Sequence, residues 1–238
     1  MFSYESDDKG EITMALDVCA IIVARGGSLR LKNKNMLDIG GYSMLAHKII
    51  QLKRCDKIDR IIVGSDSEEI LKEACFYGAE TVKRPDYYCN ESQCTANEMI
   101  YNMCSLIETD VVVWAHCTNP LLSPETYDRA VSVFLANEPM YDSLLSVTVL
   151  KEHLWTSESK PLNYNPYARS HTLARDLTPI YMQDGGIFIQ RHKNMLRNSY
   201  FFGAKPYLFI VPENEVMDIN TPRDLLVARI LLMKKTAT

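Results

Sequence analysis

Basic residues cluster directly after an apolar segment near the start of the chain. The segment at 18–24 ends at Arg25, two glycines and a serine, and three further basic residues follow by position 34. Glycines allow tight turns and bring backbone amides close to a ligand, while arginine and lysine bind phosphate oxygens. The cluster therefore indicates a polyphosphate-binding loop, and an ordinary solvent-exposed turn is the alternative interpretation.

A second set of polar residues follows the apolar segment at 110–116. His116 and Thr118 lie where that segment ends. Ligands of open α/β sheets bind beyond the carboxyl ends of the strands, so both residues are candidate pocket residues. A structural histidine is the alternative for His116.

These residues have to be positioned by a sheet, because the apolar segments are short, β-branched and continuous rather than alternating. Segments with helical spacing lie between them. This order predicts an α/β fold with a mostly parallel sheet covered by helices on both faces. Strands are expected at 18–24, 59–65, 80–82, 110–116, 143–150 and 205–211, and helices at 42–52, after the cap at 66–69, and at 94–106, 123–135 and 223–233.

The chain is expected to form one domain at 17–238, with a flexible tail at 1–16 and an insertion at 151–180. Its 238 residues, 47% hydrophobic and 24% charged, are typical of a globular protein. The net charge of −4 argues against a nucleic-acid-binding protein. No apolar stretch approaches the ~20 residues of a membrane helix, and the first residues do not resemble a signal peptide.

Seven cysteines occur in the chain, and none forms a CxxC pair. Their odd number and their positions in apolar segments indicate reduced thiols, as in a cytoplasmic protein. Cys89 and Cys94 could ligate a metal, but the sequence lacks the second pair that such a site needs.

The loop sequence ARGGSLRLKNKN resembles the pattern ARGGSKRxPxKN of the CMP-acylneuraminate synthetases and related CMP-sugar cytidylyltransferases. In that family the loop wraps the triphosphate of CTP. Leu29 replaces a lysine of the family pattern, and Lys32 replaces its proline. The resemblance extends over about residues 18–235 and implies a nucleotide-diphosphosugar-transferase-like, Rossmann-like fold.

Two further positions match nucleotide-contacting residues of the family. Arg84 matches the arginine of its Arg-Pro pair. Thr95 lies near a small hydroxyl residue that contacts cytosine, and a plain helix cap is an equal alternative. The resemblance thus implies the following nucleotide-binding residues: Ala24, Arg25, Gly26, Gly27, Ser28, Lys34, Asn35, Arg84, Thr95 and Thr118.

Residues 215–222 resemble the family segment that binds Mg²⁺. Asp218 matches its first metal-binding carboxylate, and Asn220 replaces the second. Mg²⁺ prefers oxygen ligands and retains waters, so one carboxylate and substrate phosphates can suffice. The resemblance therefore implies Mg²⁺ as the cofactor, held by Asp218 and Asn220, and capping of the last helix by these residues is the alternative.

The expected acceptor is a small acid, and several residues around it differ from the family pattern. His116, Met182 and Asp184 replace a glutamine, an arginine and an asparagine of the sialic-acid enzymes. N-acetylneuraminate is therefore predicted to be a poor substrate, because its carboxylate loses a forked contact and meets a negative charge. The family's insertion reaches a second subunit, which implies a homodimer. The candidate acceptor-binding residues are His116, Asn119, Arg169, Arg175 and Asp184.

Together with the resemblance, these residues predict a cytidylyltransferase: an acceptor oxygen attacks the α-phosphorus of CTP and pyrophosphate leaves. The predicted catalytic residues are Arg25, Lys34, Asp218 and His116, with metal coordination or His116 activating the acceptor. The acceptor is a nonulosonic or other sugar acid, or alternatively a phosphonate or phosphate monoester. Two other classes stay open, a nucleotide-binding module without catalysis and a sugar-nucleotide glycosyltransferase. Neither a nucleic acid nor a membrane is expected as a partner.

Overall fold

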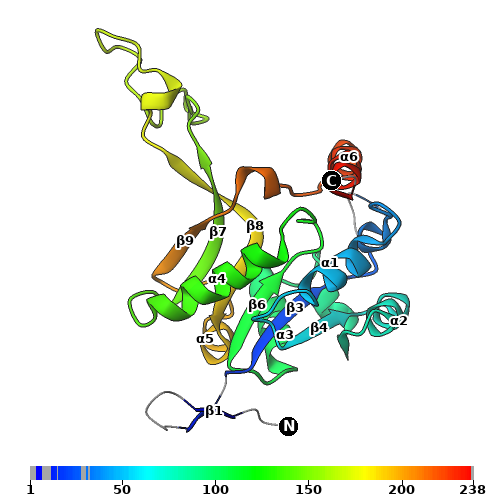
Figure 1. Ribbon diagram of the computed structural model, residues 1–238. Helices are drawn as coiled ribbons and strands as arrows, with labels where there is room; N and C mark the ends of the chain where they lie inside the picture. The colour runs from blue at the N-terminus through cyan, green and yellow to red at the C-terminus, as the bar shows by residue number, and fades with distance from the viewer. Residues whose placement is uncertain (1–3, 7–11, 15, 28–30, 32, 237–238) are drawn as a thin grey trace.

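The computed structural model describes residues 4–6, 12–14, 16–27, 31 and 33–236, and its central feature is one sheet (Figure 1). The strands of this sheet are β3 (Val18–Val23), β4 (Arg60–Ser65), β5 (Glu80–Lys83), β6 (Val111–Ala115), β7 (Ser143–Leu150), β8 (Ile180–Arg191) and β9 (Pro206–Ile210). Their order is β5-β4-β3-β6-β8-β7-β9. β8 pairs antiparallel with β6 and β7, whereas the remaining pairs are parallel. The prediction of a mostly parallel sheet is confirmed.

Helices cover both faces of the sheet, as predicted. α1 (Met44–Leu52), α2 (Glu68–Phe76), α4 (Pro124–Asn137) and α6 (Pro222–Thr236) contribute to the core on one face, and α3 (Ala96–Ser105) and α5 (His192–Asn198) to the core on the other. Alternate residues of a strand point to opposite faces. Accordingly, Ala20 and Ile22 of β3 join the first core, and Cys19 and Ile21 join the second.

The predicted strands and helices are present within a few residues of their expected bounds. Hydroxyl side chains cap four of the helices: Ser43, Ser67, Thr95 and Ser123 each accept a hydrogen bond from a first-turn amide. The caps at Ser67, Thr95 and Ser123 were predicted, and the cap at Ser43 was not. Neither β8 nor α5 was predicted from the sequence. β8 carries the polar run 183–186 in its middle, and α5 has only seven residues, so neither has a clear hydrophobic period.

A long projection extends away from the sheet between β7 and β8 (Figure 1). We call residues 151–179 the arm. The two strands pair as far as Leu150 and Ile180, with a register shift between Leu145 and Val147, and the arm continues beyond them. The short turn η3 (Ala174–Asp176) lies within it. The arm thus occupies the segment in which the sequence predicts an insertion.

The N-terminal segment lies outside the central sheet. β1 (Tyr4–Ser6) and β2 (Ile12–Met14) form an antiparallel pair, and the rest of the tail predicted at 1–16 falls largely outside the described residues. Among the helices that the structure describes, none combines the length and the apolar character needed to cross a membrane.

Candidate active site

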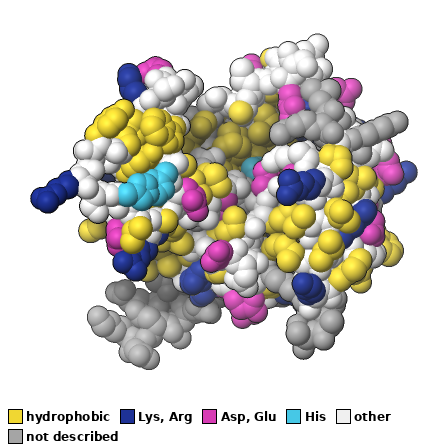
Figure 2. All heavy atoms as spheres, turned by 90° about the horizontal axis from the view of Figure 1, so that it is seen from above, with side chains coloured by type: hydrophobic (Ala, Val, Ile, Leu, Met, Phe, Trp, Pro, Cys, Tyr) yellow, Lys and Arg dark blue, Asp and Glu magenta, His cyan; other side chains and the backbone are white. Residues whose placement is uncertain are grey.

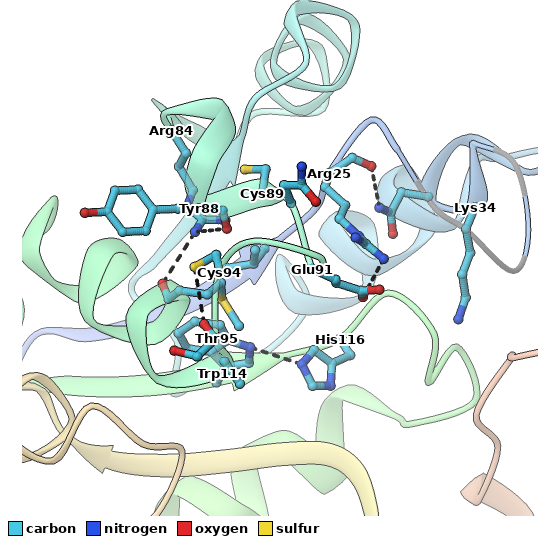
Figure 3. Close-up of a pocket in the computed structure, with 15 residues that line it drawn as sticks. Arg25, Lys34, Arg84, Tyr88, Cys89, Glu91, Cys94, Thr95, Trp114 and His116 are labelled. Carbon is cyan, nitrogen blue, oxygen red and sulfur yellow. Dashed lines mark hydrogen bonds and ion pairs between the residues drawn. The ribbon is translucent and has the colours of Figure 1, made fainter.

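A pocket of about 500 Å³ opens where three parallel strands end (Figure 3). Arg25 follows β3, Arg84 follows β5 and His116 follows β6, so the sheet brings three distant parts of the sequence to one place. Six residues predicted for the site line this pocket: Arg25, Lys34, Asn35, Arg84, Thr95 and His116. The other lining residues are Val23, Tyr88, Cys89, Asn90, Glu91, Cys94, Ala96, Met99 and Trp114.

Arg84 is a buried arginine with one donor left over. Its Nε donates to Asn102 Oδ1 at 3.1 Å, and its Nη2 donates to the carbonyls of Tyr88 and Met99 at 3.1 and 3.4 Å. Its Nη1 is buried without a partner among the described residues. Burial lowers the pKa of the guanidinium, and an unpaired buried donor is costly. An acceptor atom of a ligand in the pocket would pair with Nη1.

Gly64 of β4 makes room for this arginine. A Cβ atom at position 64 would lie 2.7 Å from Cδ of Arg84 and would also collide with Sδ of Met103. A glycine in a strand interior often marks such a close approach. The sequence signal for the site was therefore present in β4 as well as in the Arg-Pro pair.

Arg25 forms an ion pair with Glu91 across the pocket (Figure 3). The Glu91 side chain is 60% exposed and that of Arg25 is 21% exposed, so the pair is accessible to a ligand. Glu91 was not a predicted site residue, because nothing in its local sequence pattern separates it from a solvent-exposed glutamate.

Neighbouring side chains fix the shape of the basic loop. Asn35 donates from Nδ2 to the carbonyl of Arg25 at 3.4 Å, and the Gly26 amide donates to Asp66 Oδ1 at 3.0 Å. Ser67 caps α2, so Asp66 supports the loop rather than the helix.

Several loop positions lie outside the main pocket. Ala24 was predicted to bind the nucleotide, but it is buried in the core and does not line the pocket. Gly26 and Gly27 line smaller cavities beside Arg25. Ser28 falls outside the described residues.

Lys34 connects the basic loop to the C-terminal segment. Its Nζ donates to Asn220 Oδ1 at 3.4 Å, and Asn220 Nδ2 donates to Asp218 Oδ2 at 2.5 Å. The amide nitrogen, rather than the oxygen, therefore faces Asp218. Asn220 positions the Asp218 carboxylate in this arrangement instead of sharing a cation with it.

The side chains of Thr221 and Asp224 cap the last helix, α6, so the side chains of Asp218 and Asn220 do not. Thr221 Oγ1 accepts from the Asp224 amide at 3.2 Å, and Asp224 Oδ2 accepts from the Thr221 amide at 2.7 Å. This reciprocal cap leaves the exposed Asp218 carboxylate available to a ligand.

The donor set fits Mg²⁺ rather than a metal held by the protein alone. The described residues contain no group of three or more His, Cys, Asp or Glu side chains that could hold a metal ion. Cys89 and Cys94 therefore do not belong to such a group. Asp218 is an exposed carboxylate. Mg²⁺ is commonly bound by one or two carboxylates together with substrate phosphates. The chemistry of this segment is compatible with a cation that arrives with a polyphosphate.

His116 has both ring nitrogens bonded within the protein. Nε2 accepts from Trp114 Nε1–H at 3.1 Å, so Nδ1 carries the proton and donates to the Gly185 carbonyl at 2.7 Å. Burial lowers the pKa of the imidazole, which favours the neutral form. No lone pair of this ring is directed at the pocket, so the predicted role as a general base has to be corrected. His116 is a pocket wall that links β6 to β8.

Thr95 caps α3 and also lies at the pocket. Its side chain accepts from the Glu98 amide at 3.2 Å, and Glu98 Oε2 accepts from the Thr95 amide at 2.9 Å, which is a capping box. The same residue lines the pocket. The cap is therefore confirmed, and the contact with the base stays a prediction.

Three residues predicted for the nucleotide or the acceptor bond to groups of the protein outside the pocket. Asn119 is buried, and its Nδ2 donates to the carbonyls of Asp184 and Met217 at 3.2 and 2.9 Å. Thr118 donates to Asn119 Oδ1 at 3.3 Å, and the Asp184 carboxylate accepts from Ser146 Oγ and from the Gly186 amide. None of the three lines the pocket, and their side-chain polar atoms bond to other groups of the protein.

The two arginines predicted for the acceptor lie on the arm, away from the pocket of their own chain. Arg169 and Arg175 are exposed, and Arg175 Nε lies 3.6 Å from Asp176 Oδ1. Figure 1 shows the arm projecting from the body. Arg169 and Arg175 therefore do not line the pocket that contains Arg25 and Arg84 of the same chain.

Comparison with known proteins gives relatives along nearly the whole chain. Residues 19–217 match the family described as cytidylyltransferase. The pseudaminic acid cytidylyltransferase of Campylobacter jejuni is 26% identical over 220 residues, covering 89% of this chain and 94% of that protein. The CMP-N,N'-diacetyllegionaminic acid synthase of Legionella pneumophila is 27% identical over 220 residues, with 87% and 92% covered. The N-acylneuraminate cytidylyltransferase of Escherichia coli is 28% identical over 233 residues, covering 93% of this chain and 54% of that protein.

Solved structures share the fold at lower identity. CMP:2-keto-3-deoxy-manno-octonic acid synthetase complexed with CTP has a TM-score of 0.65 at 15% identity, with 92% of this chain and 99% of that chain covered. The 4-diphosphocytidyl-2C-methyl-D-erythritol synthase of Anaerococcus prevotii has a TM-score of 0.66 at 15% identity, with 92% and 96% covered.

Proposed function

Because the chain belongs to the cytidylyltransferase family and is a CTP-dependent nucleotidyltransferase, we propose that its acceptor is a nonulosonic acid. Three relatives carry names of such acids: pseudaminic, N,N'-diacetyllegionaminic and N-acylneuraminic acid. An acceptor hydroxyl oxygen would attack the α-phosphorus of CTP. The bond from this phosphorus to the bridging oxygen would break, pyrophosphate would leave, and the hydroxyl proton would be lost to solvent or to a leaving phosphate oxygen.

The pocket at the ends of β3, β5 and β6 is the main support for CTP binding. Arg25 and Lys34 line it on the side of the basic loop, and arginine and lysine suit a triphosphate. Arg84 lines it with an unpaired buried donor, which would pair with an acceptor atom of the cytosine ring. A CTP molecule bound this way would have to displace Glu91 from Arg25.

We propose Mg²⁺ as the cofactor, bound by Asp218 and the triphosphate. The carboxylate is exposed, and Asn220 and Lys34 lie beside it. Mg²⁺ would supply charge stabilisation to the phosphates. The chain's own contribution would be to hold Asp218 in place and to bind phosphate oxygens through Lys34 and Arg25.

We further propose a homodimer in the cytoplasm. The arm exposes the large apolar side chains of Trp155, Leu162 and Tyr167, and apolar side chains are visible on the surface in Figure 2. A second subunit that packs against the arm would bury these side chains. The arm's Arg169 or Arg175 would then lie near the pocket of that second subunit. All seven cysteines are free, as in proteins of reducing compartments.

An acceptor panel at fixed CTP and Mg²⁺ tests the proposal. We expect pyrophosphate release and a CMP conjugate by mass spectrometry with pseudaminic or N,N'-diacetyllegionaminic acid, and slower turnover with N-acetylneuraminate. The loss of the family's arginine at Met182 does not set that order, because all three acids carry a carboxylate that would lose the same contact. The Asp184 carboxylate no longer supports it, because Ser146 and Gly186 already donate to this group.

The panel should include a phosphonate and a phosphate monoester, the alternative acceptors. Fastest turnover with either of them would contradict a nonulosonic acid while leaving cytidylyl transfer intact. CTP binding without pyrophosphate release for any acceptor would favour an inactive nucleotide-binding module. Release of a free nucleotide from a sugar nucleotide would favour a glycosyltransferase.

A further inference from the structure

A lysine is completely buried behind the site, and nothing in the reaction described above uses it. Lys48 lies on α1, and none of its surface is exposed. Its Nζ donates to Gln51 Oε1 at 2.5 Å, to the Asn119 carbonyl at 2.8 Å and to Tyr127 Oη at 2.9 Å. The three donors of an ammonium group thus meet three acceptors.

Two other side chains of α1 hold the same stretch of backbone. Gln51 Nε2 donates to the Pro120 carbonyl at 3.1 Å and to the Leu122 carbonyl, and His47 Nε2 lies 3.0 Å from the Pro120 carbonyl. The segment from 119 to 122 follows β6 and has no regular hydrogen-bonded partner strand. Side chains of α1 therefore satisfy its carbonyls and fix its path.

Hydrogen bonds connect this segment to the residues on both sides of Asp218, the proposed metal ligand. Asn119 Nδ2 donates to the Met217 carbonyl at 2.9 Å, and the Ile219 amide donates to the Thr118 carbonyl at 2.9 Å. Residue 218 is thus clamped on both sides, through 217 and 219. Its carboxylate is the one that accepts from Asn220.

We propose that Lys48 is a positioning residue, which holds the Asn119 carbonyl and thereby sets the position of Asp218 at the site. This inference rests on the proposed function for the role of Asp218. It predicts that the loss of the Lys48 ammonium disturbs residues 217–219, on a different segment, more than it disturbs CTP binding.

A buried ammonium is an expensive way to fill a core position. Burial lowers the pKa of Lys48 to about 7. The ionisable side chains around it are Cys55, Cys117 and Glu215, and the Tyr127 ring centroid lies 5.0 Å from Nζ. An apolar residue of similar volume usually serves packing alone at least as well as a buried charge. The directed contact with the Asn119 carbonyl gives the lysine a role that an apolar residue could not replace.

The test compares Lys48→Met with Lys57→Met, a matched replacement of an exposed lysine. Amide hydrogen exchange is followed at Ile219 and, as an internal reference, in the pocket segment at 84–95. Steady-state kinetics give kcat and the KM for CTP. For Lys48→Met we expect exchange at Ile219 to accelerate about tenfold or more, with 84–95 unchanged. We expect kcat to fall about tenfold or more with the KM for CTP within about threefold, because a small displacement of a reacting group affects chemistry more than binding. Lys57→Met should change none of these.

A double-mutant cycle with Asn119→Ala separates positioning from general destabilisation. If Lys48 acts largely through the Asn119 side chain, Lys48→Met should lower kcat by less in the Asn119→Ala background than in the wild type, because only the bond from the Ile219 amide to the Thr118 carbonyl then remains. Fully additive losses, or unchanged exchange at Ile219, would overturn the proposal. Should Lys48→Met fail to fold, Tyr127→Phe removes one acceptor of the ammonium and should shift the same readouts in the same direction by less. If no acceptor is turned over, the exchange at Ile219 still decides the positioning role, so a failure of the proposed function is distinguishable.

Discussion

Replacing Asn220 with aspartate is the sharpest perturbation of the proposed metal segment. Asn220 Nδ2 donates to Asp218 Oδ2 at 2.5 Å, so Asn220→Asp replaces a donor with a second carboxylate. A hydrogen bond to a charged group contributes about 1.5–3 kcal/mol. Two exposed carboxylates about 4 Å apart repel by about 1 kcal/mol in water.

Lys34 offsets part of this loss, because its Nζ lies 3.4 Å from Asn220 Oδ1 and would form an ion pair with the new carboxylate. An exposed ion pair contributes about 0.2–1 kcal/mol. The net destabilisation without a divalent cation is therefore about 2 kcal/mol. In a domain of this size it lowers Tm by about 4–8 °C.

A divalent cation should reverse the sign of the effect. Mg²⁺ carries two charges, so an added carboxylate about 4 Å away attracts it by about 2 kcal/mol in water. We expect the Mg²⁺ concentration for half-maximal activity to fall about tenfold or more, and Mg²⁺ to raise the Tm of Asn220→Asp more than that of the wild type.

Thermal unfolding with and without Mg²⁺, followed by Mg²⁺ titration of turnover, measures both quantities. Asn214→Asp adds the same charge at an exposed position of the neighbouring turn and should change neither. If the Tm of Asn220→Asp falls by the same amount with and without Mg²⁺, and the Mg²⁺ requirement is unchanged, the metal does not bind at this segment.

The remaining predictions concern the pocket, the arm and the buried lysine. Arg84→Lys should raise the KM for CTP about tenfold, because a forked guanidinium is replaced by a point charge; an unchanged KM would remove Arg84 from the nucleotide site. Glu91→Gln should lower the KM for CTP about threefold by releasing Arg25 and removing a negative charge beside the proposed phosphate site, and a higher KM would show that Glu91 helps to bind the ligand. Deleting 153–170 should give a monomer by light scattering, and an unchanged dimer would place the interface elsewhere. The pKa of Lys48 falls from 10.5 to about 7 on folding, so the unfolded chain binds more protons between these two values and the free energy of unfolding should rise with pH from about 7 to about 10.5. Urea unfolding should show that this rise is lost in Lys48→Met.

The local sequence determined much of the sheet and one side of the pocket. The strands were predictable because each is a continuous apolar run bounded by turn residues, and the helix starts were predictable because Ser or Thr precedes them. The family pattern and the rule that ligands bind at strand ends identified Arg25, Arg84 and His116 as pocket residues. Family membership, predicted from the basic loop, is confirmed.

Only the tertiary structure decided what the polar atoms at these positions do. Asn119 lies where an acceptor-binding residue was predicted, but its amide bonds the backbone at 184 and 217. Lys48 has an ordinary position on an amphipathic helix, and two of its three hydrogen-bond partners lie 71 and 79 residues away. Hydrophobic periodicity depends on residues a few positions apart, so it can be recognised from the local sequence alone. The partner of a buried donor depends on which distant segments the packed sheet brings within about 3 Å, and that is set only when the whole chain has folded.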